Sequence, residues 1–226
     1  MNATKIEYLD FTWSPLVGCS GTNCAVAAKC WAKYQAKRRK HKCQNCYEFK
    51  PHTHFERLTQ PLRVYTPKKI GVCFSADMWD NGFTEYARQT VLLTAKCAPQ
   101  HWFINLTKQP QNIPENAWFP DNWVQGVSVC TKKDLWRIET LEKTQAKIKM
   151  VSFEPLYEYL GIVDLSGISW IIIGNQTHPL KEAKPIWIDS LILDAKNVVD
   201  KKIPVFVKNN VKDFDYKEFP SIFSQG

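Results

Sequence analysis

Short apolar runs recur along the chain and are separated by longer segments with helical periodicity. The runs are continuous and do not alternate with polar residues, a pattern typical of strands buried on both faces of a parallel sheet. We therefore predict strands at residues 9–12, 70–74, 102–106, 124–129, 150–153, 170–173 and 204–207.

The segments between these runs are long enough to be crossover helices. In one of them, Leu135, Ile138 and Leu141 keep helical spacing. A repeated strand, helix, strand order predicts an α/β fold with six to seven parallel strands. The predicted helices are 27–40, 84–98, 132–147 and 186–201.

Two arrangements fit this order, a partial or full βα (TIM-like) barrel and a doubly wound sheet. Polar side chains follow several of the predicted strands, and in a barrel they would converge on one mouth, where barrel enzymes have their active sites. Taken singly, each is more often a turn or cap residue; as a repeated set they favour a site. They include Ser75, Asp77, Lys108, Ser128, Glu154, Asn175 and Lys208.

The bulk composition bounds the class of protein. With 226 residues and 44% hydrophobic content, the chain can bury one core, so we expect a single domain, 1–226, with residues 41–56 as a metal-binding insertion. No N-terminal apolar run and no stretch near the roughly 18 apolar residues of a membrane span is present, so we expect a soluble, cytoplasmic protein without a membrane partner. The absence of a glycine-rich phosphate loop argues against P-loop chemistry.

Charge adds a candidate partner. The formal net charge is +8, and the stretch 25–47 contains basic residues but no acidic one. Clustered cations favour polyanions, so DNA or RNA binding through residues 29–42 is one reading, and a solvated helix face is the other. The basic residues are Lys29, Lys33, Lys37, Arg38, Arg39, Lys40 and Lys42.

Cysteines are concentrated near the N-terminus. Of eight cysteines, five fall between residues 19 and 46, which in a chain without a secretory signal indicates metal or redox chemistry more than disulfides. Cys19, Cys24 and Cys30 offer soft thiolates that select zinc, copper or iron–sulfur clusters, and three ligands leave one coordination position open for chemistry. Cys73 and Cys97 are isolated, and we expect both to be small buried hydrophobic residues.

A second spacing lies just beyond. Cys43 and Cys46 form a CxxC pair, and His52 and His54 follow, which gives Cys-x2-Cys-x5-His-x-His. Such a set can be a complete zinc site by itself. Whether the chain has one metal centre or two stays open at the level of sequence.

A series of landmarks resembles a known family. In order, TWSPLVGCS, CWAKYQAKR, HFERLTQPL, FSADMWD, NLTKQP, GVSV, VSFEPL, IIIGNQ and FVKN are similar to those of a phage- and archaea-associated three-cysteine-motif family, over residues 5 to 209. That family is similar to radical S-adenosylmethionine (SAM) enzymes, with spore photoproduct lyase as a distant relative. The resemblance implies a βα barrel and a 4Fe-4S cluster that binds SAM and cleaves it to a deoxyadenosyl radical.

The resemblance also implies site residues. Cys19 and Cys30 match the family's first and last cysteines, whereas Cys24 is displaced from the middle position, so Cys43 or Cys46 are substitutes to consider. His54 falls in the HxERL-like landmark, which assigns it to the barrel more readily than to zinc, and leaves His52 as the histidine ligand. Glu154 and Lys108 are the catalytic candidates, with an ion pair between Glu154 and Lys108 or Lys208 as the alternative role. Ser75, Asp77, Ser128, Asn175 and Lys208 are implied cofactor contacts.

Three functions compete on this basis. The first is a radical SAM enzyme that takes an electron from an electron donor and modifies or repairs a nucleic acid or nucleotide. The second is a non-catalytic, zinc-bearing nucleic-acid-binding domain built on Cys43, Cys46 and the basic helix. The third, a metal-dependent hydrolase, lacks an HExxH or paired-histidine signature. The sequence does not name the substrate, the donor or the oligomeric state.

Overall fold

The fold is built on one large, mostly parallel sheet. The computed structural model describes residues 1–21, 24, 27–38, 43–177, 179–199 and 201–224. In these residues an eight-stranded sheet has the order β1-β2-β5-β6-β7-β8-β9-β12, and only β1 pairs antiparallel with its neighbour. The predicted α/β class and its parallel strands are therefore confirmed. The strands are β1 (Asn2–Ala3), β2 (Phe11–Trp13), β5 (Lys69–Val72), β6 (Trp102–Thr107), β7 (Trp123–Ser128), β8 (Ile148–Phe153), β9 (Trp170–Ile173) and β12 (Val205–Val207).

Two small ribbons and several helices complete the chain. The ribbons pair β3 (Leu16–Val17) with β4 (His52–Thr53), and β10 (Gln176–Thr177) with β11 (Leu180–Lys181). The α-helices are α1 (Trp31–Lys37), α2 (Gln44–Glu48), α3 (Glu85–Lys96), α4 (Trp136–Glu142) and α5 (Pro185–Lys196). The 3-10 turns are η1 (Ala27–Lys29), η2 (Phe55–Arg57), η3 (Pro61–Arg63), η4 (Pro110–Asn112), η5 (Lys132–Asp134) and η6 (Ser221–Ser224).

All four predicted helices are shorter in the structure, and two of them are also divided. The segment 132–147 divides into η5 and α4, which ends before Thr144 because the Thr144 hydroxyl and backbone N–H both donate to the Leu141 carbonyl. The segment 27–40 divides into η1 and α1, and residues 39 and 40 lie outside the described residues. A threonine hydroxyl that bonds to a backbone carbonyl competes with the helical hydrogen bonds and weakens the helix at that point.

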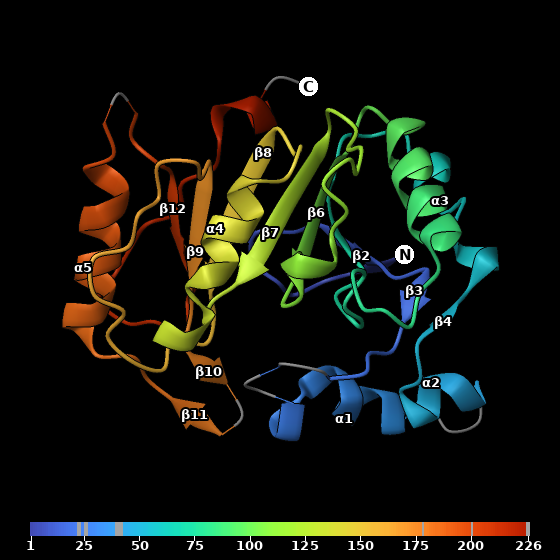
Figure 1. Ribbon diagram of the computed structural model, residues 1–226, viewed down its shortest axis with the longest axis horizontal. Coiled ribbons are helices and arrows are strands. Elements are labelled where there is room, and N and C mark those ends of the chain that lie inside the picture. The colour runs from blue at the N-terminus through green and yellow to red at the C-terminus, as the bar shows by residue number, and fades with distance from the viewer. Residues whose placement is uncertain (22–23, 25–26, 39–42, 178, 200, 225–226) are drawn as a thin grey trace.

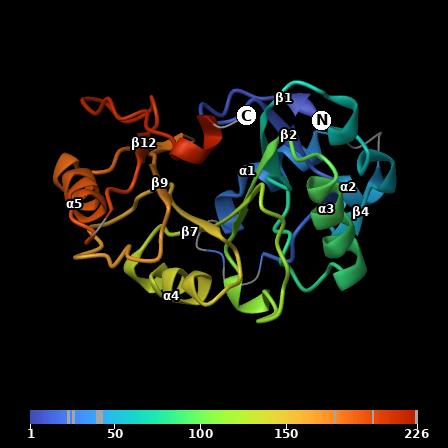
Figure 2. The ribbon, with the colours of Figure 1, turned by 90° about the horizontal axis from the view of Figure 1, so that it is seen from above.

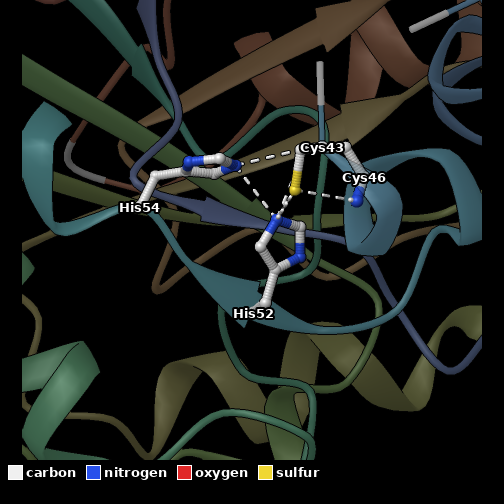
Figure 3. Close-up of side chains that lie close together, drawn as sticks. All are labelled: Cys43, Cys46, His52 and His54. Carbon is white, nitrogen blue, oxygen red and sulfur yellow. Dashed lines mark hydrogen bonds between the residues drawn. The ribbon is translucent and has the colours of Figure 1, made fainter. Parts of the chain in front are cut away.

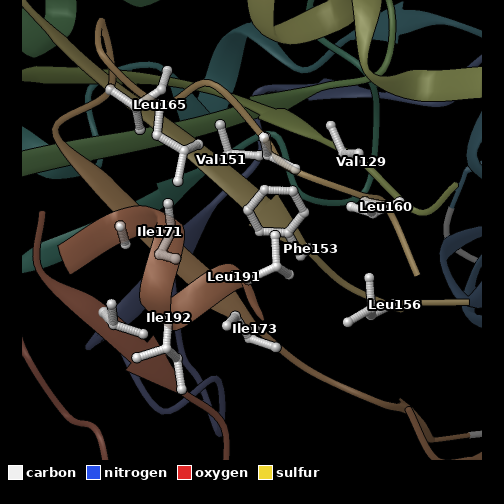
Figure 4. Packing of buried hydrophobic residues seen from close by; sticks show 14 of the residues in the cluster. Val129, Val151, Phe153, Leu156, Leu160, Leu165, Ile171, Ile173, Leu191 and Ile192 are labelled. Carbon is white, nitrogen blue, oxygen red and sulfur yellow. The ribbon is translucent and has the colours of Figure 1, made fainter. Parts of the chain in front are cut away.

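The sheet is buried on both faces, as the continuous apolar runs predict. Along β9, Trp170 and Ile172 pack on one face and Ile171 and Ile173 on the other, and all four are fully buried. Figure 2 shows that the sheet curves and that α3, α4 and α5 lie on its outer side. Figure 4 shows part of that outer core, where Leu191 of α5 approaches the side chains of β8 and β9. The order of β2 and the later parallel strands follows the chain without a reversal.

The parallel strands deliver their carboxyl ends to one edge of the sheet. We call it the carboxyl edge, and it is the lower edge in Figure 1, where the arrowheads of β6 and β7 point. Helices α1 and α2, from the cysteine-rich segment, lie below this edge in the same view. The fold thus brings the cysteines and the polar strand ends to one side of the molecule. Among the described residues, no helix is long and apolar enough to cross a membrane.

Candidate metal centre

The β3–β4 ribbon carries the first half of a metal-type site. Val17 of β3 pairs with His52 of β4, so His52 is fixed by backbone pairing to the segment that leads into Cys19. His54 lies two residues further, and its backbone N–H donates to the Pro15 carbonyl at 2.7 Å. Because side chains of an extended segment alternate, residues 52 and 54 project to the same face.

Helix α2 carries the second half. Cys43 is its N-cap, and the Cys43 sulfur accepts a hydrogen bond from the Cys46 backbone N–H at 3.4 Å. The helix ends at Phe49, which has a left-handed conformation with φ of 58°. This turn returns the chain to β4 within a few residues, so that the CxxC pair faces the two histidines.

The four side chains converge on one point (Figure 3). Their ligand atoms all lie within 4.8 Å of one another. The Cys46 sulfur is 3.3 Å from His52 Nε2 and 3.1 Å from His54 Nε2, and the two Nε2 atoms are 3.0 Å apart. A tetrahedral zinc with ordinary bond lengths needs ligand separations of about 3.3 Å between two nitrogens and about 3.6 Å between a sulfur and a nitrogen. Cys43, Cys46, His52 and His54 thus form a Cys2His2 group that fits zinc; we call it the quartet.

The outer nitrogens of both imidazoles are also held. His52 Nδ1 lies 2.8 Å from the Lys50 carbonyl oxygen, and His54 Nδ1 lies 2.7 Å from the Glu56 carboxylate. These acceptors keep the proton on Nδ1 and leave Nε2 free to bind a metal, which is the usual support of a zinc-bound histidine. Burial lowers the pKa of His54, although its bond to Glu56 acts in the other direction.

The structure places His54 in the quartet with His52, Cys43 and Cys46, although the HxERL-like landmark assigned it to the barrel. The Cys-x2-Cys-x5-His-x-His spacing was the signal in the sequence for this group. Since Cys43 and Cys46 face histidines, the structure does not place them as substitutes for Cys24.

The other three clustered cysteines lie apart from the quartet. Cys19, Cys24 and Cys30 are each partly buried, and Cys19 and Cys30 both pack against a small cluster of Ala32, Ala36 and Phe49. Burial raises the pKa of Cys19 to about 12, with nearby Asp77 and Asp80 acting in the same direction. Without a metal, Cys19 is therefore a neutral thiol. The Cys24 carbonyl accepts a hydrogen bond from the Ala27 backbone N–H at 3.1 Å.

Asp80 anchors the start of the cysteine loop, and sequence reasoning missed it. Its Oδ2 accepts from Cys19 Sγ at 3.5 Å, from the Ser20 backbone N–H at 2.9 Å and from Gln109 Nε2 at 3.0 Å. Gly82 N–H donates to Oδ1 at 2.9 Å. Burial alone would raise the pKa of Asp80, but these bonds outweigh it and the pKa is lowered. Its place in the FSADMWD landmark was the available signal, yet that landmark suggested only Asp77.

Strand-end residues form a hydrogen-bonded series along the carboxyl edge. Asp77 accepts from Thr107 Oγ1 at 2.6 Å and from the Lys108 backbone N–H at 2.8 Å. Lys108 Nζ in turn lies 3.5 Å from Ser128 Oγ. Burial raises the pKa of Asp77, against the effect of these bonds. The structure thus gathers Asp77, Lys108 and Ser128, as the parallel order predicts.

Glu154 and Lys208 form an ion pair, which was the alternative role named for Glu154.

Asn175 has structural partners, because its side chain donates to the Asn210 carbonyl at 2.7 Å and accepts from the Ala183 backbone N–H at 2.8 Å. The Ser75 carbonyl accepts from the Gly18 N–H at 3.3 Å, and no side-chain bond of Ser75 is described.

Of the isolated cysteines, Cys73 is buried as expected and Cys97 is not. Cys97 is the C-cap of α3 and is exposed. The buried face of α3 carries Val91, Leu92 and Ala95, and helical geometry places position 97 on the opposite side. A single cysteine gives no signal of which face it occupies.

These features define a mixed α/β protein with a predominantly parallel sheet and a Cys2His2 metal-type site beside the carboxyl edge. A family model described as "Protein of unknown function (DUF5131)" matches residues 3–212, so the chain belongs to the DUF5131 family. No curated protein and no solved structure matches the chain.

Proposed function

We propose that the chain is a radical SAM-like iron–sulfur enzyme that takes an electron from a donor protein, cleaves SAM reductively, and modifies or repairs a nucleic acid or nucleotide. The proposal includes the finer fold, a partial βα barrel. Two features support that fold: the parallel strands follow one another in chain order, and the sheet curves with its long helices on the outer side (Figure 2). Both are properties of βα barrels.

The position of the cysteine loop is the observation that carries the proposal. Gly18 makes a parallel β-bridge to Ala76, which follows β5 in the chain. The next residue, Cys19, donates from its Sγ to Asp80 Oδ2 at 3.5 Å. The loop therefore begins at the carboxyl edge, next to Asp77 and Lys108. Barrel enzymes have their chemistry at this edge because the loops that follow the strands meet there.

The donor set fits an iron–sulfur cluster. Three partly buried thiols lie on one segment, and thiolates are the ligands of such clusters. Cys19, Cys24 and Cys30 would hold the cluster, which supplies the electron for SAM cleavage when it is bound. Lys108 and the Glu154–Lys208 pair would bind charged groups of SAM and substrate, with Ser75, Asp77, Ser128 and Asn175 beside them.

In this proposal the quartet is a separate, structural zinc site. All four of its ligands come from protein side chains, which is the rule for structural zinc, whereas a catalytic zinc keeps an open position. Its role is to fix the β3–β4 ribbon that leads into Cys19. Cys19 N–H donates to the Phe49 carbonyl at 3.3 Å, so the quartet's helix also contacts the cysteine loop directly.

Metal analysis after anaerobic purification tests both sites. We expect about four irons with matching sulfide and about one zinc per chain, and deoxyadenosine as the product of reduced protein with SAM. Cys30→Ala should lose iron and keep zinc, Cys46→Ser should lose zinc, and Cys97→Ser is the matched control that should lose neither. Zinc without iron after anaerobic reconstitution would overturn the enzyme proposal.

The quartet also favours a second candidate function, the non-catalytic, zinc-bearing nucleic-acid-binding domain. Its supporting observation is the closed Cys2His2 group beside a basic helix. The same preparation separates the two: a zinc protein that binds nucleic acid and never acquires iron supports this second function, and SAM cleavage excludes it.

A further inference from the structure

Helix α1 exposes large aromatic side chains toward solvent. Trp31 is 56% exposed and Tyr34 is 67% exposed. The opposite face of the helix is covered, since Ala32 and Ala36 are buried against Phe49. Trp31 and Tyr34 are three residues apart and so lie on one helix face. Exposed aromatic rings cost free energy in water, so a pair on one face indicates a contact surface.

Basic side chains flank the two rings. Lys33, Lys37 and Arg38 are all exposed. Arg38 is four residues after Tyr34, so helical geometry places it directly beside that ring. The two lysines are four residues apart and lie along one border of the exposed face. No acidic residue occurs between positions 25 and 47 to neutralise them.

We propose that this face of α1, formed by Trp31, Lys33, Tyr34, Lys37 and Arg38, binds single-stranded nucleic acid. Bases stack on Trp31 and Tyr34, and the basic side chains contact the phosphates. The inference rests on the nucleic-acid part of the proposed function and specifies the form of that nucleic acid. A duplex keeps its bases stacked inside, whereas a single strand offers each base face to an aromatic ring.

The place of α1 agrees with this partner. The helix begins directly after Cys30 and lies below the carboxyl edge (Figure 1). Helix α1 therefore lies on the side of the molecule that gathers Asp77, Lys108 and Ser128 (Figure 1). An enzyme that acts on a base needs that base unpaired, which a single-strand surface provides.

Fluorescence anisotropy with labelled dT20, rU20 and a 20-base-pair duplex tests the inference. We expect both single strands to bind more tightly than the duplex at low salt. Trp31→Ala and Tyr34→Ala should each weaken single-strand binding about tenfold, because stacking on an aromatic ring supplies much of the affinity. Tyr86→Ala, at an exposed tyrosine on α3, is the matched control and should leave binding unchanged.

The charged residues have their own test. Lys33→Gln with Lys37→Gln should reduce the slope of log affinity against log salt by about 1.4, since each single-strand phosphate contact contributes about 0.7. The exposed pair Lys201→Gln with Lys202→Gln removes the same charge elsewhere and should leave the slope unchanged. Circular dichroism of each variant verifies that the fold is retained.

Equal affinity for single strand and duplex would overturn the inference, as would aromatic variants that bind like the unchanged protein. Iron content is measured on the same preparation, so the two proposals fail separately. SAM cleavage without binding of dT20 or rU20 overturns this surface and leaves the enzyme proposal. Binding that depends on Trp31 and Tyr34, without iron, supports this surface and overturns the enzyme proposal.

Discussion

At the scale of single residues, Asp80 joins segments that are far apart in the chain. It is fully buried and holds both the Cys19 loop and Gln109. A buried carboxylate is tolerated only when hydrogen bonds replace its hydration. Asp80 is therefore a positioning residue for the cysteine loop, whichever metal that loop binds.

Asp80→Asn places an N–H2 group among donors that need an acceptor. We expect the free energy of unfolding to fall by about 1–3 kcal/mol, the cost of leaving buried polar groups unsatisfied. Urea denaturation of the zinc-loaded protein measures it. Asp121→Asn, at an exposed carboxylate paired with Lys147, is the control and should cost little. Equal effects of the two substitutions would contradict the role of Asp80.

His101 should make the stability of the folded protein depend on pH. It is fully buried, its Nε2 faces the Pro61 carbonyl at 3.2 Å, and Nδ1 has no partner among the described residues. Burial lowers the pKa of His101 from 6.5, and Lys68 adds to that effect. As the pH falls through about 6.5, His101 takes up a proton in the unfolded chain more readily than in the folded protein, where its pKa is lower. The free energy of unfolding should therefore decrease as the pH falls below about 6.5.

The measurement is the free energy of unfolding from pH 7.5 to pH 5.5. His101→Gln removes the titrating group, and its stability should fall less steeply over this range than that of the unchanged protein. Parallel curves for the two proteins would show that His101 is not responsible.

At the scale of elements, the β3–β4 ribbon and α2 form one unit around the quartet. Gly18 closes this unit against the cysteine loop, with φ of +91°, and a Cβ there would lie 2.2 Å from the Lys50 carbonyl oxygen. Only glycine accepts both the positive φ and the close approach. The ribbon, the zinc-type site and the first cysteine are thus connected through backbone contacts.

Gly18→Ala tests that connection, and Gly161→Ala is its matched control. Gly161 also has a positive φ, of +83°, but no atom lies within 4 Å of its added Cβ. We expect Gly161→Ala to cost about 1–2 kcal/mol for the backbone conformation alone. Gly18→Ala should cost about 1–3 kcal/mol more, because of the overlap, and should weaken zinc retention. If both substitutions lower the stability equally in thermal unfolding, the Lys50 segment must move aside at little cost in free energy.

At the scale of the whole molecule, side chains from the C-terminal part of the chain cover the concave face of the curved sheet. The segment after residue 212, which we call the C-terminal extension, contributes Phe219 and Phe223 to a core that includes Trp170 and Phe206. The Phe219 ring is 5.5 Å from the Trp170 ring and 5.3 Å from the Phe206 ring. Glu218 adds an ion pair with Lys196 at 2.5 Å.

Phe219→Ala should therefore destabilise the protein as a whole. We expect a loss of about 2–3 kcal/mol, below the value for a fully buried phenylalanine because Phe219 is only half-buried. Chemical denaturation followed by tryptophan fluorescence measures it. Tyr65→Ala, at a side chain that is 85% exposed, should change stability by less than about 0.5 kcal/mol. A loss that small for Phe219→Ala would show that the extension contributes little.

The sequence by itself determined the α/β class, the parallel strands and their burial on both faces, because strand periodicity and continuous apolar runs are local properties. It also contained the complete ligand spacing of the quartet. Only the tertiary structure decided that His54 belongs to the quartet, that Asp80 holds Cys19, and that Cys97 is exposed. Asp80 and Cys19 are 61 residues apart. Contacts of this kind depend on how the strands are ordered in space, which no local pattern records.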